Sequence, residues 1–206
     1  MKIILILIIF SLVFVSCYSH EPSSNDYELI EKYFPLKIGN KWEYSFEGVG
    51  ENAILERIIK NNTTHEDGSK IWGYTEAVKV NNPNPNEPIA GYFTLKSDGF
   101  YFYSSAKDTM FPGTNILCKK QLLLKPPISV GTQWETTDGF LCRIAKIGTY
   151  KVLDTNYKNT VLVISERNQG IDSSWYSPNV GLVKHVQSIQ HQSSIKWELR
   201  DCSLLE

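Results

Sequence analysis

The chain has 206 residues, a net charge of −1 at pH 7, and 21 basic residues interspersed with 22 acidic ones. This balance argues against electrostatic attraction to nucleic acid as the basis of function. The length suits one domain with a well-buried core, and the 11 Tyr, 9 Phe and 5 Trp residues favour β-strands.

The N-terminal segment has the pattern of an export signal. Lys2 gives a positively charged start, and residues 3–15 form an apolar run that is too short to span a bilayer as a helix. The run ends in FVSC, which resembles the lipobox of bacterial lipoproteins, with Phe in place of the usual Leu. This resemblance implies that residues 1–16 are a cleaved signal peptide. It also implies that Cys17 carries a diacylglycerol and an acyl chain such as palmitate, which would anchor the protein to a membrane.

An ordinary secreted protein is the alternative to the lipoprotein. If Cys17 is lipidated, residues 17–25 form a polar tether and residues 26–206 form a single β-rich domain close to the membrane. Tyr18, rather than Asp, follows the Cys; by the sorting rule known for enteric bacteria, this resembles an outer-membrane lipoprotein of the cell envelope.

One short helix is predicted at the start of the domain, from Asp26 to Tyr33. It is expected to end there because Pro35 cannot continue a helix and restricts the residue before it. Beyond it, apolar and polar residues alternate as in half-buried strands, most clearly in residues 195–200. Asp-Gly pairs at 67–68, 98–99 and 138–139 predict hairpins. We expect roughly ten antiparallel strands in an all-β meander that forms a strongly curved sheet or an open barrel.

A nine-residue unit occurs twice, as PLKIGNKWE and as PISVGTQWE. The residues common to both copies include no nucleophile, and neither copy contains a histidine or cysteine that could act as a base or metal ligand. We interpret each unit as a turn followed by a strand whose Trp anchors it in the core. The predicted turn and anchor residues are Pro35, Gly39 and Trp42 in the first copy and Pro127, Gly131 and Trp134 in the second.

These units resemble a largely uncharacterised family of exported bacterial β-rich proteins and lipoproteins. The family's motifs correspond here to PLKIGNKWEY, PISVGTQW and WYSPNVGLVK, and the last contains Gly181 at a further turn. The resemblance covers most of the chain beyond the signal. It implies an envelope location and a β-rich fold, and it supplies no catalytic residues.

Three cysteines remain if Cys17 is lipidated. Cys118 and Cys142 are symmetric about Val130 and would face each other if the flanking segments formed one long antiparallel ladder, so we expect a possible disulfide between them. The spacing matches no zinc site, and we expect no metal and no cofactor.

The residues that often carry catalysis form no recognisable pattern. His185 and His191 are interpreted as ordinary surface histidines, and Glu56, Glu76 and Glu166 are expected to face solvent. There is no Gly-x-Ser-x-Gly elbow and no phosphate-binding loop. In the aromatic run GFYFYSS, one face is expected in the core, and the other could line a cavity, pack under the helix or stack on sugars.

The favoured function is therefore a non-catalytic binding or structural role in the envelope, with an unknown ligand or protein partner. A carrier or chaperone of an apolar ligand, held in a half-barrel cavity, is the first alternative. An envelope hydrolase is the second. A carrier predicts an apolar cavity with few ionisable residues, whereas an enzyme predicts acids or histidines that converge in a cleft.

Overall fold

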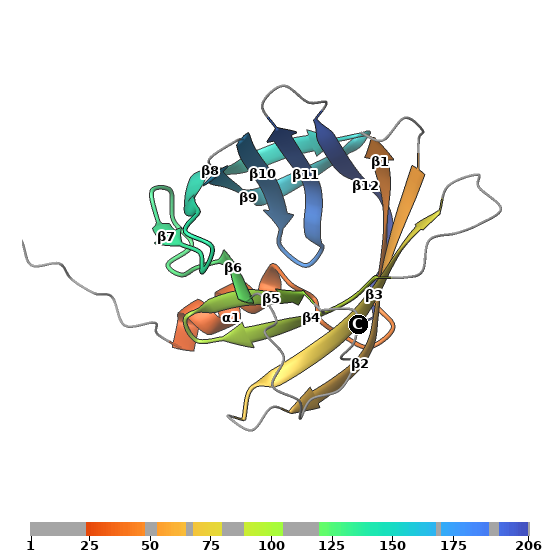
Figure 1. Cartoon of the computed structure of the whole chain (residues 1–206), viewed down its shortest axis with the longest axis horizontal. Helices are drawn as coiled ribbons and strands as arrows, with labels where there is room; N and C mark the ends of the chain where they lie inside the picture. Colours follow the sequence, from red (N-terminus) through yellow and green to blue (C-terminus); the bar gives the residue numbers. More distant parts are fainter. Residues whose placement is uncertain are drawn as a thin grey trace, which may run out of the picture.

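The computed structural model describes residues 24–47, 53–64, 68–79, 89–104, 120–167, 170–189 and 194–205. Within these ranges the chain forms one helix and twelve strands (Figure 1). The elements are α1 (Ser24–Lys32), β1 (Lys41–Glu47), β2 (Ala53–Thr64), β3 (Lys70–Lys79), β4 (Ile89–Lys96), β5 (Gly99–Ser104), β6 (Lys120–Leu124), β7 (Gln133–Glu135), β8 (Leu141–Val152), β9 (Thr155–Arg167), β10 (Gly170–Ser177), β11 (Gly181–Ile189) and β12 (Ile195–Ser203).

All twelve strands belong to one antiparallel sheet in the order β6-β5-β4-β3-β2-β1-β12-β11-β10-β9-β8-β7. Consecutive strands are neighbours, except that β1 pairs with β12 at the middle and β6 and β7 form the two edges. Figure 1 shows the sheet curling round, so that its two edge strands approach each other. The predicted all-β meander, strongly curved and not closed, is confirmed.

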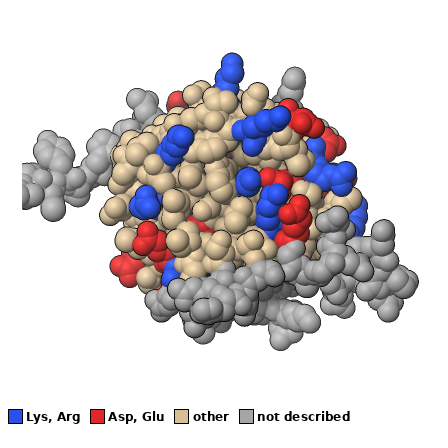
Figure 2. Space-filling model, turned by 90° about the horizontal axis from the view of Figure 1, so that it is seen from above, with Lys and Arg blue, Asp and Glu red and all other residues tan. Residues whose placement is uncertain are grey.

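Alternation along the strands gives the sheet a concave inner face and a charged outer face. In β12, Trp197 and Leu199 face inward, as the pattern predicted, while Glu198 on the outer face accepts hydrogen bonds from Lys184 at 2.8 Å and Lys196 at 2.7 Å. Figure 2 shows basic side chains lying beside acidic ones on the face that it presents. Charges of both signs thus lie on the outer face of the sheet, and the inner face is rich in aromatic residues.

The predicted Asp-Gly hairpins lie between neighbouring strands. Gly68 precedes β3 with φ 81° and Gly139 precedes β8 with φ 78°. Ser97 and Asp98 form the two-residue turn between β4 and β5. A positive φ is accessible to Gly without steric cost, and the Asp-Gly pairs therefore mark the turns correctly.

Helix α1 begins at Ser24, two residues earlier than predicted and inside the segment assigned to the tether. Its apolar face and the residues that follow it are buried, and the ring of Phe34 stacks on that of Phe100 with centroids 3.3 Å apart. The Tyr33 hydroxyl donates to the Asn159 carbonyl at 2.9 Å. The residues that follow the helix thus connect β5 with β9.

The two copies of the repeated unit form the same hydrogen-bonded turn. Gly39 N donates to Ile59 O, and Ile59 N donates to Asn40 O, each at 2.9 Å. In the second copy, Gly131 N donates to Ile144 O, and Ile144 N donates to Thr132 O, also at 2.9 Å. Both glycines have φ 94°.

A further contact also recurs, because the residue after each glycine bonds back to the proline carbonyl. Asn40 Nδ2 donates to Pro35 O at 2.6 Å, and Thr132 Oγ1 donates to Pro127 O at 2.7 Å. The first unit leads into β1 and the second into β7, the first strands of two successive sets of six.

The edges β6 and β7 are joined by side chains rather than by a backbone ladder. In the described chain β6 pairs only with β5, and β7 only with β8. Trp134 Nε1 donates to Leu122 O at 2.9 Å, and Thr137 Oγ1 donates to Lys120 O. We call this contact between β6 and the β7 region the seam.

The long antiparallel ladder around Val130, on which the expected Cys118–Cys142 disulfide was based, is not formed by the described residues. Cys142 lies in β8, where it is opposite Trp134 of β7 and Ser165 of β9, while residues 120–124 pair with β5 instead. Cys142 carries a free, buried thiol and Cys202 a free, half-buried one. Cys118 and the predicted anchor Cys17 lie outside the described residues. No helix in the described ranges is long and apolar enough to cross a membrane.

Candidate functional site: the cavity of the open barrel

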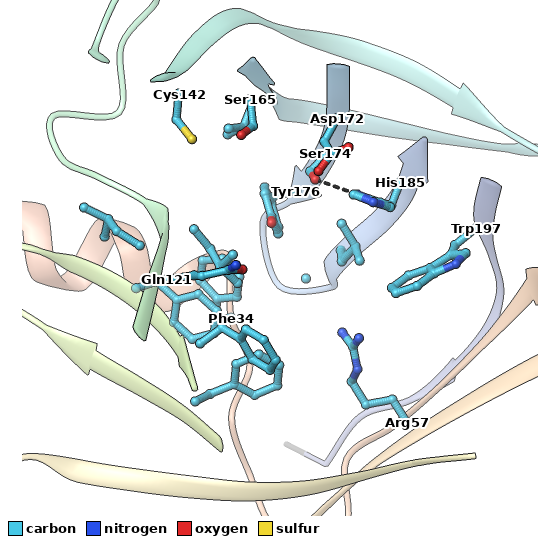
Figure 3. A pocket seen from close by; sticks show the side chains of 18 of the residues that line it. Phe34, Arg57, Gln121, Cys142, Ser165, Asp172, Ser174, Tyr176, His185 and Trp197 are labelled. Carbon is cyan, nitrogen blue, oxygen red and sulfur yellow. Dashed lines mark hydrogen bonds between the residues drawn. The ribbon is translucent and has the colours of Figure 1, made fainter. Parts of the chain in front are cut away.

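A cavity of about 340 Å³ lies inside the curved sheet, and Figure 3 shows part of its lining. Its residues come from strands throughout the sheet and from the segment after α1. Three of the predicted structural residues, Pro35, Trp42 and Gly181, belong to the lining as well. The Trp42 indole donates to Val180 O at 2.6 Å, which fixes the β10–β11 turn against β1.

One wall of the cavity is aromatic. Phe93 stacks on Phe100 with centroids 5.2 Å apart and on Tyr74 at 4.6 Å. Phe34 covers Phe100, and Phe102 lies 6.1 Å from the Phe93 centroid. The wall offers ring faces and edges to an apolar or aromatic group.

The aromatic run in β5 supplies part of this wall. Phe100 and Phe102 point inward, whereas Tyr101 is buried on the opposite side beneath Lys120, whose ammonium lies 4.0 Å from the ring centroid. The Tyr101 hydroxyl donates to Asp98 Oδ2 at 2.6 Å. One face of the run therefore lines the cavity, and the other is covered by the chain itself.

An ion pair lies at the edge of the aromatic wall. Arg57 Nε and Nη2 donate to Glu76 Oε2 at 2.9 Å and 2.5 Å, and the two side chains are only 13 % and 12 % exposed. Burial alone would lower the pKa of Arg57, but the nearby Glu76 carboxylate raises it, so the guanidinium stays charged.

The opposite wall is polar. Ser174 Oγ and His185 Nδ1 are 2.9 Å apart, as Figure 3 shows. Asp172 forms an ion pair with Arg167, while its Oδ1 is buried without a partner in the described structure. Cys142 and Ser165 continue this wall toward β8.

Burial shifts the protonation of this wall. It lowers the pKa of His185 to about 4, helped by the positive charges of Arg167 and Arg57, so the imidazole is neutral at pH 7. It raises the pKa of Asp172, although Arg167 acts in the opposite direction. It also raises the pKa of the Cys142 thiol, against the effect of a hydrogen bond with Ser165. At neutral pH the wall therefore has a neutral histidine and a protonated thiol.

Two expectations about these residues are wrong. His185 is half-buried and lines the cavity instead of lying on the surface, and Glu76 faces inward instead of toward solvent. Glu166 is half-exposed as expected, and Glu56 lies on the outer face between Lys41 and Lys79. His191 lies outside the described residues.

A sequence signal for these inward charges did exist. Arg57 alternates with buried Leu55 and Ile59 in β2, so it belongs to the apolar face of its strand. Glu76 likewise follows Trp72 and Tyr74 at a spacing of two. A charge on the apolar face of a strand indicates a paired or functional group, because unpaired burial is costly.

The described part of the chain contains no group of three or more metal-ligating side chains. Nor does a described carboxylate hydrogen-bond to His185. The arrangement offers hydrogen bonds, two guanidinium groups and aromatic surface.

No protein-family model matches the chain, and no curated protein matches it. Two solved structures share its fold. One is a presumed exported protein with a YmcC-like fold from Bacteroides fragilis, with a TM-score of 0.52, 10 % identity, and coverage of 82 % of this chain and 98 % of that one. The other is a presumed lipoprotein from Parabacteroides distasonis, with a TM-score of 0.50, 12 % identity, and coverage of 83 % and 98 %. At these identities the likeness establishes the fold alone.

Proposed function

We propose that this protein is a lipid-anchored component of the bacterial cell envelope, and that it binds a small amphipathic molecule in its cavity without transforming it. The observation that carries the binding role is a cavity of about 340 Å³ with aromatic rings on one wall and hydrogen-bonding groups on the other. This volume lies at the lower end of the range for small-molecule sites, roughly 300–1,000 Å³.

The envelope location is supported by the lipobox-like sequence at Cys17. The two structural neighbours, described as exported and as a lipoprotein, are compatible with it. Attachment to the outer membrane is part of the proposal and rests on Tyr18. Labelling with palmitate that disappears in Cys17→Ala, together with release of the protein from the membrane fraction, is the expected result.

The chemistry of the polar wall favours binding over catalysis. The Ser174–His185 contact resembles a nucleophile with its base, but a histidine with a pKa of about 4 is a weak base at neutral pH. The cavity also contains more charge than an apolar carrier needs, because Arg57 and Arg167 both line it. An amphipathic ligand uses both walls.

Native mass spectrometry of the protein released from the envelope in mild detergent tests this function. We expect the wild-type protein to carry a small-molecule mass that is lost on denaturation. Ser174→Phe places a ring in the cavity and should abolish the bound mass. Ser173→Phe adds the same ring to the neighbouring position of β10, outside the lining, and should retain it. A protein mass without ligand in the wild type, or equal loading of both variants, would contradict the proposal.

A further inference from the structure

Arg57 stands among aromatic rings. Its guanidinium carbon lies 5.1 Å from the centroid of Tyr74 and 5.7 Å from that of Phe93. The rings of Tyr44 and Trp197 are each 5.9 Å away. A cation in this position has lost most of its water and needs acceptors or ring faces in exchange.

Glu76 engages only part of the guanidinium. Both recorded hydrogen bonds, from Nε and Nη2, end on the single oxygen Oε2, and no described residue accepts from Nη1. A guanidinium has five N–H donors in a planar fork. Figure 3 shows the Arg57 guanidinium directed toward the space below His185 and Tyr176, so its remaining donors face the cavity.

The positive charges of two arginines also act on the opposite, polar wall. Arg167 and Arg57 both act on the same imidazole, and together with burial they lower the pKa of His185. The two carboxylates of the cavity, Glu76 and Asp172, are each already paired with their own arginine. These two pairs leave the lining without net charge, so a negative group would be held by the guanidinium donors that the carboxylates do not use.

We infer that the ligand is a small amphipathic monocarboxylate, bound through the free edge of Arg57 with its apolar part against Phe93, Phe100 and Phe102. This inference rests on the proposed binding function and names the class of ligand. A carboxylate matches the planar donor edge of a guanidinium, and a single partly used arginine suits a monoanion. Ser174 Oγ and neutral His185 are placed to orient the polar end of such a molecule.

The test compares ligands that differ only in charge. Binding of 4-phenylbutyrate and its amide, and of decanoate and its amide, is measured by calorimetry at pH 7 on the full mature protein. The wild-type protein should bind each carboxylate about tenfold more tightly than its amide. In Arg57→Gln/Glu76→Gln, which removes both charges and leaves neither unpaired, the preference should disappear while the amides bind as before.

A matched control exists on the outer face. Arg143 and Glu166 form an exposed pair between β8 and β9, with N···O 3.7 Å. The variant Arg143→Gln/Glu166→Gln should keep the full preference for carboxylates. Equal binding of acid and amide by the wild-type protein would overturn the inference and leave the binding function intact. Failure of all four compounds to bind would also overturn the inference, and the bound mass measured by native mass spectrometry decides the binding function separately.

Discussion

The turn before β1 and the turn before β7 are built from the same contacts, yet the strands that follow them differ in place and in chemistry. β1 is central, with β2 on one side and β12 on the other, whereas β7 is a three-residue edge strand that pairs, among the described strands, with β8 alone. Trp42 bonds across the barrel to the β10–β11 turn, and Trp134 bonds across the seam to β6. A local sequence thus determines a local turn, while its distant partners depend on topology.

The inner faces of the two sets of six strands differ even more. β3 to β5 of the first set contribute Tyr74, Phe93 and Phe100, whereas β9 to β11 of the second contribute Ser165, Ser174 and His185. Both sets also place one arginine–carboxylate pair in the lining. The cavity is amphipathic because the two sets of six strands, although each begins after the same kind of turn, place different residues on their inner faces.

The largest expected effect distinguishes the two tryptophans. Trp42→Ala should lower the free energy of unfolding by about 4 kcal/mol, since it leaves a large hole between strands paired on both sides. Trp134→Ala should cost about 3 kcal/mol or less, because an edge strand can collapse more easily onto the hole. Urea denaturation monitored by circular dichroism measures both.

Replacement of each Trp by Phe separates packing from hydrogen bonding. Each Phe variant leaves the Val180 or Leu122 carbonyl without its indole donor, at a cost of about 1 kcal/mol. If Trp134→Ala proved as costly as Trp42→Ala, the distinction between central and edge positions would be wrong.

The second expected effect is a pH dependence of stability that comes from His185 in the polar wall. Unfolded His185 binds a proton near pH 6.5, but in the folded protein burial, with Arg167 and Arg57, lowers its pKa to about 4. The unfolded state therefore binds more protons between these values, and stability falls as pH drops from about 6.5 to about 4. The loss amounts to about 3 kcal/mol at pH 4.

His185→Gln should remove this part of the pH dependence while keeping a partner for Ser174. Denaturation curves at a series of pH values measure it. Tyr44→Phe is the control from the first half, since burial raises the pKa of Tyr44 well above this range. An unchanged pH profile in His185→Gln would refute the assignment.

The smallest effect compares the two turn glycines. Gly39→Ala and Gly131→Ala place a Cβ at φ 94°, which should cost about 1–2 kcal/mol each. Gly39→Ala should cost slightly more, because its Cβ would lie 3.1 Å from Leu205 Cδ1, whereas nothing lies within 4 Å at Gly131. Thermal unfolding measures both. Gly148→Ala, a strand position with its nearest neighbour at 3.9 Å, should leave stability unchanged or raise it; equal losses at all three positions would contradict the turn argument.

The fold could be predicted from the sequence because its signals are local. Alternation in residues 195–200 identifies the inward face of β12, and Asp-Gly pairs mark hairpins. The helix start was misplaced by two residues, since boundaries depend on tertiary contacts.

The cavity could not be predicted, because its two walls meet only through the curvature of the whole sheet. Arg57 lies in β2 and His185 in β11, 128 positions apart in the sequence, and no local spacing relates them. Glu76 was expected to face solvent because charge is more often exposed. Its alternation with Tyr74 indicated otherwise.

The seam has a consequence for how the barrel behaves as a container. Every other junction between neighbouring strands is a backbone ladder, whose register fixes the distance between strands at about 4.8 Å. At the seam, the described residues are joined by one hydrogen bond from an indole and one from a hydroxyl. Among the described strands, the seam is therefore the place where widening the barrel for a larger guest would break no backbone ladder. The same side chains cover the carbonyls of Leu122 and Lys120, which would otherwise invite strand addition from another chain.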